Sequence, residues 1–147
     1  MGNSAKDFFT ETQKEDIKNA IQTAELETSG EIRVHIENEC DGDVMDRAAT
    51  VFEKLGMAKT ELRNGVLFYL AVKNRKFAII GDKGINTNVP EDFWDVVKMK
   101  MLNHFREGRF STGLEEGIEM VGIELKKYFP YMSDDVNELP DEISFGK

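Results

Sequence analysis

The fold is decided by the stretch Glu31-Ile32-Arg33-Val34-His35-Ile36-Glu37, in which polar and apolar residues alternate. Successive side chains of a β-strand point to opposite faces, so Ile32, Val34 and Ile36 share one face and the polar residues share the other. We therefore predict a strand with one buried face and one face that is wet or lightly covered. On this interpretation we expect His35 to be a surface residue of the polar face, and the alternative is a catalytic imidazole.

A second strand is predicted at residues 66–72, where an unbroken apolar run is typical of a strand buried on both faces. Between the two strands, residues 43–55 carry apolar residues at helical spacing, with Asp43 as the N-cap. Strand, helix and strand in this order form a βαβ unit with parallel strands. The turn Asn74-Arg75 then leads to a short strand at residues 77–80, which closes an antiparallel hairpin.

Three more helices are predicted around this sheet, at residues 10–28, 90–108 and 112–129. Gly117 and Gly122 lie inside the last of them. Each costs about 1 kcal/mol relative to alanine in a helix interior, which indicates close backbone packing on a neighbour. We therefore predict an α/β fold: a small mixed β-sheet, made of a βαβ unit plus an antiparallel hairpin, flanked by helices on both faces.

Length and charge restrict the domain organisation and the partners. The chain has 147 residues, 19 basic and 28 acidic, for a net charge of −9. We predict one domain over residues 1–130 and an acidic, loosely ordered tail over residues 131–147. The excess of acids argues against nucleic acid as a partner, because phosphate backbones need a concentrated cationic face. It favours a protein partner, such as a membrane-protein complex.

The same sequence indicates a cytoplasmic protein without direct membrane insertion. No apolar stretch approaches the roughly 18–20 residues that span a bilayer. The first residues, Met1 to Lys6, lack the apolar core of a secretory signal. Cys40 is the only cysteine, so no internal disulfide can form.

Two clusters at the strand ends are candidate sites. Asp41, Asp43 and Asp46 follow the first strand, and their carboxylates are hard ligands suited to Ca²⁺ or Mg²⁺. The alternative is an acidic loop that only caps the following helix. The basic turn at residues 73–76 is expected nearby.

The opposite end of the sheet carries the second cluster. Asp82 and Glu91 are a second possible metal pair, and turn chemistry is the alternative interpretation of the glycines beside them. The residues expected to line a ligand cleft at this end are Arg63, Asn64, Gly65, Gly81, Lys83 and Gly84.

Four segments carry a family resemblance: SGEIRV at residues 29–34, NGVL at 64–67, RKFAIIGDKG at 75–84 and FSTGLEEGI at 110–118. Together they resemble the TPM domain family, whose members occur among thylakoid-lumen, phosphatase-like and membrane proteins. The resemblance implies a mixed sheet flanked by helices. It also implies a link to a plant lumenal branch described as an acid phosphatase with bound calcium.

Two functions from different classes follow. The first is a TPM-like protein-binding or assembly module without chemistry of its own, which fits the lack of a recognised nucleophile–base arrangement or cofactor motif. The alternative is a weak acid phosphatase that depends on a divalent metal. In that case Asp41, Asp43, Asp82 and Glu91 are the candidate ligands, and Lys83 or Arg63 contacts the phosphate.

Overall fold

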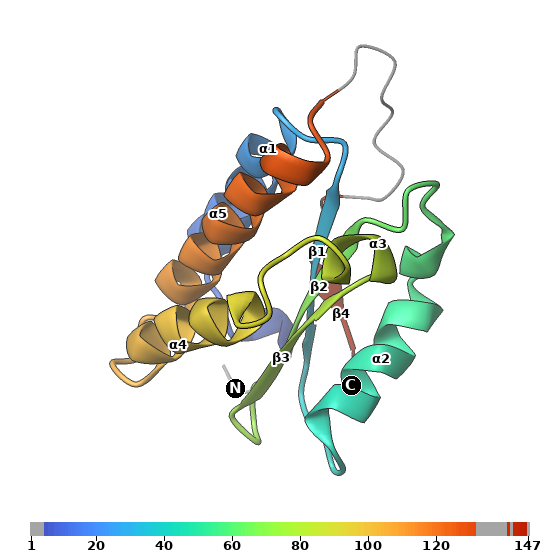
Figure 1. The fold of residues 1–147 in the computed structure, drawn as a ribbon. Helices are drawn as coiled ribbons and strands as arrows, with labels where there is room; N and C mark the ends of the chain where they lie inside the picture. Colours follow the sequence, from blue (N-terminus) through green and yellow to red (C-terminus); the bar gives the residue numbers. More distant parts are fainter. Residues whose placement is uncertain (1–4, 132–140, 142, 147) are drawn as a thin grey trace.

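The computed structural model describes residues 5–131, 141 and 143–146 (Figure 1). Its sheet has four strands in the order β3-β2-β1-β4. Strand β1 (Glu31–Glu37) pairs in parallel with β2 (Gly65–Ala71), and β2 pairs antiparallel with β3 (Lys76–Gly81). The predicted mixed sheet of a βαβ unit and a hairpin is therefore confirmed.

Helices cover both faces of this sheet, as predicted. Figure 1 shows α1, α4 and α5 together on one side, and α2 on the other. The helix that separates β1 from β2 is α2, which Asp43 caps. The helical elements are η1 (Ala5–Asp7), α1 (Glu11–Glu25), α2 (Val44–Lys54), η2 (Met57–Lys59), α3 (Lys83–Asn86), α4 (Phe93–Phe105) and α5 (Phe110–Tyr128). Among the described residues, no helix combines the length and apolar character that a membrane crossing needs.

Two apolar cores lie on the two faces of the sheet. The first contains Ile32, Val34 and Ile36 of β1 together with residues of α1, α4 and α5. The second contains Leu67 of β2 together with residues of α2. Strand β2 contributes to both cores, which explains why its apolar run shows no alternation.

The glycines of α5 allow close helix packing. A Cβ atom on Gly117 would lie 2.6 Å from Sδ of Met101, and one on Gly122 would lie 2.8 Å from Cβ of Ala24. Helix α5 thus approaches α4 at the first position and α1 at the second. The close packing that the sequence predicts at both glycines is confirmed.

The polar face of β1 is buried, and here the prediction is wrong. His35 is 5% exposed and Glu37 only 1% exposed. The physical reason is that their polar groups bond to one another and to neighbouring elements, which offsets the cost of removing them from water.

The structure also has a short fourth strand that the sequence analysis does not predict. Strand β4 (Ser144–Phe145) pairs in parallel with β1 through His35 and Ile36. Two residues are too few to show a period, so the sequence contains no strand signal here. Of the predicted tail, residues 132–140, 142 and 147 lie outside the described residues.

Candidate functional site

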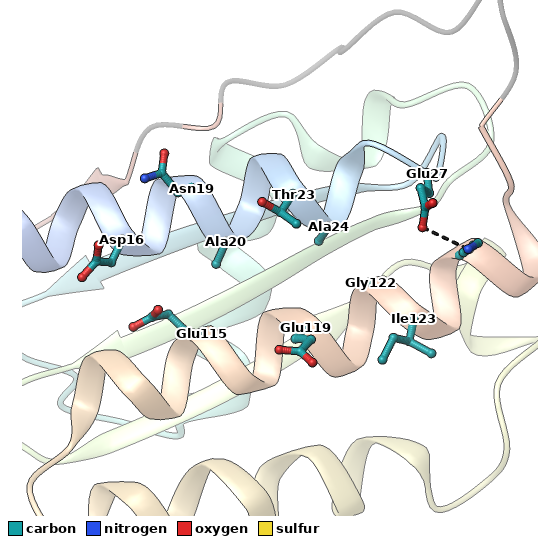
Figure 2. Close-up of a pocket in the computed structure, with 11 residues that line it drawn as sticks. Asp16, Asn19, Ala20, Thr23, Ala24, Glu27, Glu115, Glu119, Gly122 and Ile123 are labelled. Atoms are coloured by element: carbon teal, nitrogen blue, oxygen red, sulfur yellow. Dashed lines mark ion pairs between the residues drawn. The ribbon is translucent and has the colours of Figure 1, made fainter.

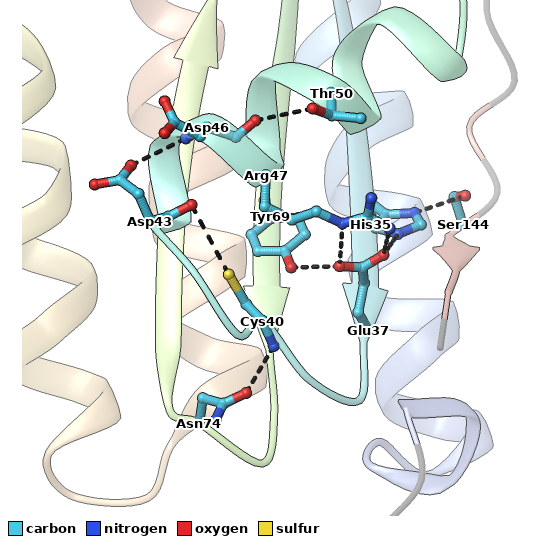
Figure 3. Close-up of polar contacts among 10 residues, drawn as sticks. All are labelled: His35, Glu37, Cys40, Asp43, Asp46, Arg47, Thr50, Tyr69, Asn74 and Ser144. Carbon is cyan, nitrogen blue, oxygen red and sulfur yellow. Dashed lines mark hydrogen bonds and ion pairs between the residues drawn. The ribbon is translucent and has the colours of Figure 1, made fainter.

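A polar cluster forms on the α2 side of the sheet, where the strand register brings three side chains together. His35 of β1 lies opposite Tyr69 of β2 and opposite Ser144 of β4. Because residues i and i+2 of a strand share a face, Glu37 lies beside His35. Helix α2 adds Arg47 to this group, and Figure 3 shows the five side chains converging.

The Glu37 carboxylate is the centre of the cluster. It accepts a hydrogen bond from Arg47 Nε at 2.9 Å, a second bond from the other end of the same guanidinium, and one from the Tyr69 hydroxyl. His35 Nε2 lies 3.2 Å from Glu37 Oε1. Burial alone raises the pKa of Glu37, but the hydrogen bonds from Arg47, Tyr69 and His35 hold it at about 2. The carboxylate is therefore ionised at neutral pH.

The His35 ring lies between this carboxylate and a hydroxyl. Its Nδ1 is 2.9 Å from Ser144 Oγ. An ionised carboxylate only accepts hydrogen bonds, so the neutral ring places its proton on Nε2 and leaves Nδ1 as an acceptor for the Ser144 hydroxyl. Burial lowers the pKa of His35, which favours this neutral form.

The acidic loop after β1 lies next to the cluster. Asp41, Asp43 and Asp46 line a depression of about 500 Å³, which Arg47 also lines. The Asp43 carboxylate accepts hydrogen bonds from the backbone N–H groups of residues 45 and 46, at 2.9 and 3.0 Å, as an N-cap does. Within the described part of the chain, no group of three or more His, Cys, Asp or Glu is arranged to hold a metal ion.

The basic turn at residues 73–76 braces this loop. Asn74 Oδ1 accepts a hydrogen bond from the Cys40 backbone N–H at 2.6 Å. Lys76 Nζ donates to the Gly42 carbonyl at 3.1 Å. The expected proximity of the acidic loop and the basic turn is confirmed.

The opposite end of the sheet brings the predicted cleft residues together. Arg63 binds Asp82 through two hydrogen bonds, Nε to Oδ2 at 2.7 Å and an Nη to Oδ1 at 2.8 Å. The Asp82 carboxylate also accepts from the Lys83 backbone N–H at 2.8 Å, as the N-cap of α3. Backbone bonds join Asp82 to Gly65 and Gly84 to Arg63, each at 3.0 Å.

Asp82 and Glu91 are not joined to each other. Glu91 is exposed before α4, and no hydrogen bond or ion pair links it to Asp82 in the described residues. The bidentate pair with Arg63 neutralises the Asp82 carboxylate, so this end of the sheet is held together by its own charges.

A groove lies on the other side of the sheet, between α1 and α5. It has a volume of about 570 Å³, and Figure 2 shows its lining. Three small residues, Ala20, Ala24 and Gly122, line it together with the 55% exposed Ile123. The polar residues of the lining are Asp16, Asn19, Thr23, Glu27, Glu115, Glu119 and Lys126.

The groove is acidic. Of its four acidic residues, Glu27 is paired with Lys126, the one basic residue of the lining, at 3.0 Å. Burial, together with the nearby charge of Asp16, raises the pKa of Glu115. Sequence reasoning missed this groove, because the small residues at 20, 24 and 122 lie on two separate helices and form a common surface only when α5 approaches α1.

Comparison with known proteins agrees with this fold. The chain matches the TPM domain over residues 3–123. It is 50% identical to the BA42 protein of the psychrophilic bacterium Bizionia argentinensis, solved by NMR, with a TM-score of 0.89 over 95% of this chain and 96% of that one. No curated protein matches it.

Two more distant structures share the fold alone. An N-terminal domain from P. gingivalis has 21% identity and a TM-score of 0.67, over 82% of this chain and 78% of that one. An N-terminal domain from Corynebacterium glutamicum has 15% identity and a TM-score of 0.65, over 88% of this chain and 81% of that one.

The Gly84→Ala variant tests whether the predicted cleft is a tightly closed turn. A Cβ atom at residue 84 would lie 2.3 Å from the Leu62 carbonyl oxygen and 2.6 Å from that of Arg63, and backbone atoms cannot move aside. We expect a loss of about 1–3 kcal/mol in the free energy of unfolding, measured by urea denaturation. Gly42→Ala is the control, because a Cβ there meets nothing within 4 Å. Equal midpoints for the two variants would contradict the prediction.

The Glu37→Gln variant tests the buried carboxylate through pH. Because the pKa of Glu37 is lowered from 4.5 to about 2, its ionised form stabilises the fold above pH 4.5, and this contribution is lost as the pH falls from 4.5 to about 2. The wild type should therefore lose about 2–3 kcal/mol more than the variant over this interval, in urea denaturation at each pH. Parallel losses in the two proteins would show that the carboxylate is not held ionised.

Proposed function

The chain belongs to the TPM domain family, and from this premise we propose that it is a protein-binding module whose α1–α5 groove holds a basic, amphipathic segment of a partner protein. The observation that carries the proposal is the groove itself, with its acidic rim and small-residue lining. A partner within a membrane-protein complex, reached from the cytoplasm, stays a prediction from the sequence.

The charge of the groove selects the charge of the occupant. After Glu27 pairs with Lys126, the acidic groups of Asp16, Glu115 and Glu119 have no basic counterpart in the lining. Burial and, after it, the charge of Asp16 raise the pKa of Glu115, so the carboxylates of Asp16 and Glu115 repel each other. A lysine or arginine from a partner would relieve that repulsion, and the net charge of −9 would speed its approach.

The shape of the groove selects a helix or an extended segment with an apolar face. Ala20, Ala24 and Gly122 present little side-chain bulk, so a partner backbone could approach α1 and α5 closely. Ile123, 55% exposed, offers apolar surface beside them. An amphipathic segment that places apolar side chains at i, i+3 and i+4, with lysines beside them, matches both features.

A charge-reversal experiment tests this function. The probe is a designed amphipathic helix of about 15 residues, made of leucine, alanine and lysine. Glu115→Lys with Glu119→Lys should weaken its binding at least about tenfold in isothermal titration calorimetry, because attraction at two positions becomes repulsion. Added salt should weaken binding to the wild type as well.

The matched control is Glu61→Lys with Glu91→Lys, which changes the net charge equally at two exposed residues outside the groove. It should retain nearly full affinity, and amide shifts on binding should concentrate in α1 and α5. If both double variants lose affinity equally, or the shifts spread over the whole sheet, the groove is not the binding site.

The acidic depression beside α2 is where a second candidate function would act, a phosphatase reaction that depends on Ca²⁺ or Mg²⁺ and that the family resemblance suggests. Asp41, Asp43 and Asp46 line it together, and the Arg47 guanidinium beside them is already bonded to Glu37, so this candidate relies on the metal ion to meet the phosphate. The Asp43 carboxylate already caps α2, which leaves the carboxylates at 41 and 46 as the ones to substitute.

Hydrolysis of p-nitrophenyl phosphate tests this candidate. We expect activity that appears with millimolar Ca²⁺ or Mg²⁺, disappears with chelator, and is lost in Asp41→Asn with Asp46→Asn, since both carboxylates would be ligands. Glu61→Gln is the control and should behave as the wild type. Activity that survives chelation or the double substitution would rule out a metal-dependent reaction at this loop.

A further inference from the structure

We propose that Ser144, His35 and Glu37 form a nucleophilic relay that transfers the acyl group of a small carboxylic ester to the Ser144 hydroxyl. The relay lies on the α2 side of the sheet, whereas the groove between α1 and α5 belongs to the other side (Figures 1 and 3). The chemistry is thus independent of the proposed binding function. It also departs from the sequence-based expectation of a module without chemistry.

The distances are those that a relay requires. Ser144 Oγ lies 2.9 Å from His35 Nδ1, and His35 Nε2 lies 3.2 Å from Glu37 Oε1. A nucleophile within hydrogen-bond reach of a base, which is itself oriented by a third group, is the general signature of nucleophilic catalysis. Here Nδ1 faces the serine and Nε2 faces the acid. Either ring nitrogen can accept a proton. The relay is therefore recognised by the geometry of its groups, whichever of Nδ1 and Nε2 faces the serine.

The acid of the relay is held by groups outside it. Arg47 donates two hydrogen bonds to Glu37, and the Tyr69 hydroxyl donates another. These bonds fix the carboxylate in one orientation and keep it charged inside the protein. A fixed negative charge beside Nε2 stabilises the imidazolium that forms when Nδ1 accepts a proton. Arg47 and Tyr69 are therefore positioning residues for the relay.

Access to the relay comes from the edge of the sheet. Ser144 is half-buried on β4, an edge strand, while His35 is 5% exposed. Helix α2 packs on β2 and β3. A reacting carbonyl would reach Ser144 from the solvent side of β4. Gly146 lies against the ring, where an added Cβ would be 2.8 Å from His35 Nε2, so little space is left for the acyl group.

Arg33 supplies a positive charge beside the relay. It precedes His35 by two residues on β1 and shares its face, and its charge acts on the His35 ring. Its Nε is buried without a hydrogen-bond partner in the described residues. A buried donor without an acceptor is costly, and an anion at this face would satisfy it. The oxyanion of an acyl-transfer intermediate is such an anion.

The reaction balances within these groups. Ser144 Oγ attacks the ester carbonyl carbon, an O–C bond forms, and the Oγ proton passes to His35 Nδ1. When the tetrahedral intermediate collapses, the bond from carbon to the leaving oxygen breaks, and the same proton passes to that oxygen, releasing an alcohol. Water then repeats the sequence on the acyl-serine and releases the carboxylic acid.

A fluorophosphonate reagent tests the relay, because it phosphonylates an activated serine and releases fluoride. We expect one adduct per chain on Ser144, located by mass spectrometry of the peptides, and none there in Ser144→Ala. His35→Gln should label at least about 100-fold more slowly, the lower range for loss of a general base. Ser111→Ala, a half-buried serine of α5, is the control and should label as the wild type.

The pH profile separates a relay from a bond that only holds β4 against β1. The groups that face His35 are Glu37, Arg33, Tyr69 and Arg47. The labelling rate should rise with pH, with a midpoint below 6.5, as His35 becomes neutral. Glu37→Gln should slow labelling at every pH even where its circular dichroism spectrum matches the wild type. A flat profile, labelling spread over several serines, or His35→Gln labelling at the wild-type rate would overturn the proposal.

Discussion

The buried charge of Glu37 is the constraint on which the α2 side of the structure depends. A carboxylate that is 1% exposed must be compensated in place, because leaving a buried charge without a partner costs about 3–5 kcal/mol. Arg47 comes from α2, Tyr69 from β2 and His35 from β1, and His35 in turn bonds to Ser144 of β4. One carboxylate thus connects a helix and three strands. Each element must be in register before the charge is satisfied.

The same constraint explains which parts of the fold the sequence could predict. The apolar alternation of β1 and the apolar run of β2 carry their own periods, so the βαβ unit and its hairpin could be derived. Polar residues carry no such information about their partners. In the sequence, His35 and Glu37 have the pattern of a solvent-exposed strand face. The groups that bury them lie on other elements, and Ser144 is 109 residues from His35 along the chain. A pattern within one strand cannot show this.

Similar reasoning separates the candidate sites. The meeting of Arg63 with Asp82 follows from two adjacent strand ends, and the prediction of a common cleft rested on that topology. The sequence could not show that the two charges would satisfy each other. The α1–α5 groove, in contrast, could not be predicted from either helix alone. Small residues on one helix do not indicate a groove. They become a feature only when Gly122 meets Ala24 across the interface.

Gly122 serves packing and surface shape at once. By omitting a side chain it lets α5 approach α1, and at the groove it leaves space where two helices would otherwise interdigitate. A larger residue would fill that space and also push the helices apart, so the groove and the core beneath it cannot be altered independently. On the other face, the bonds that make the burial of Glu37 tolerable also orient His35, the base of the relay that we propose. On each face of the sheet, the residues that hold the fold together are thus the same ones on which the proposed function would depend.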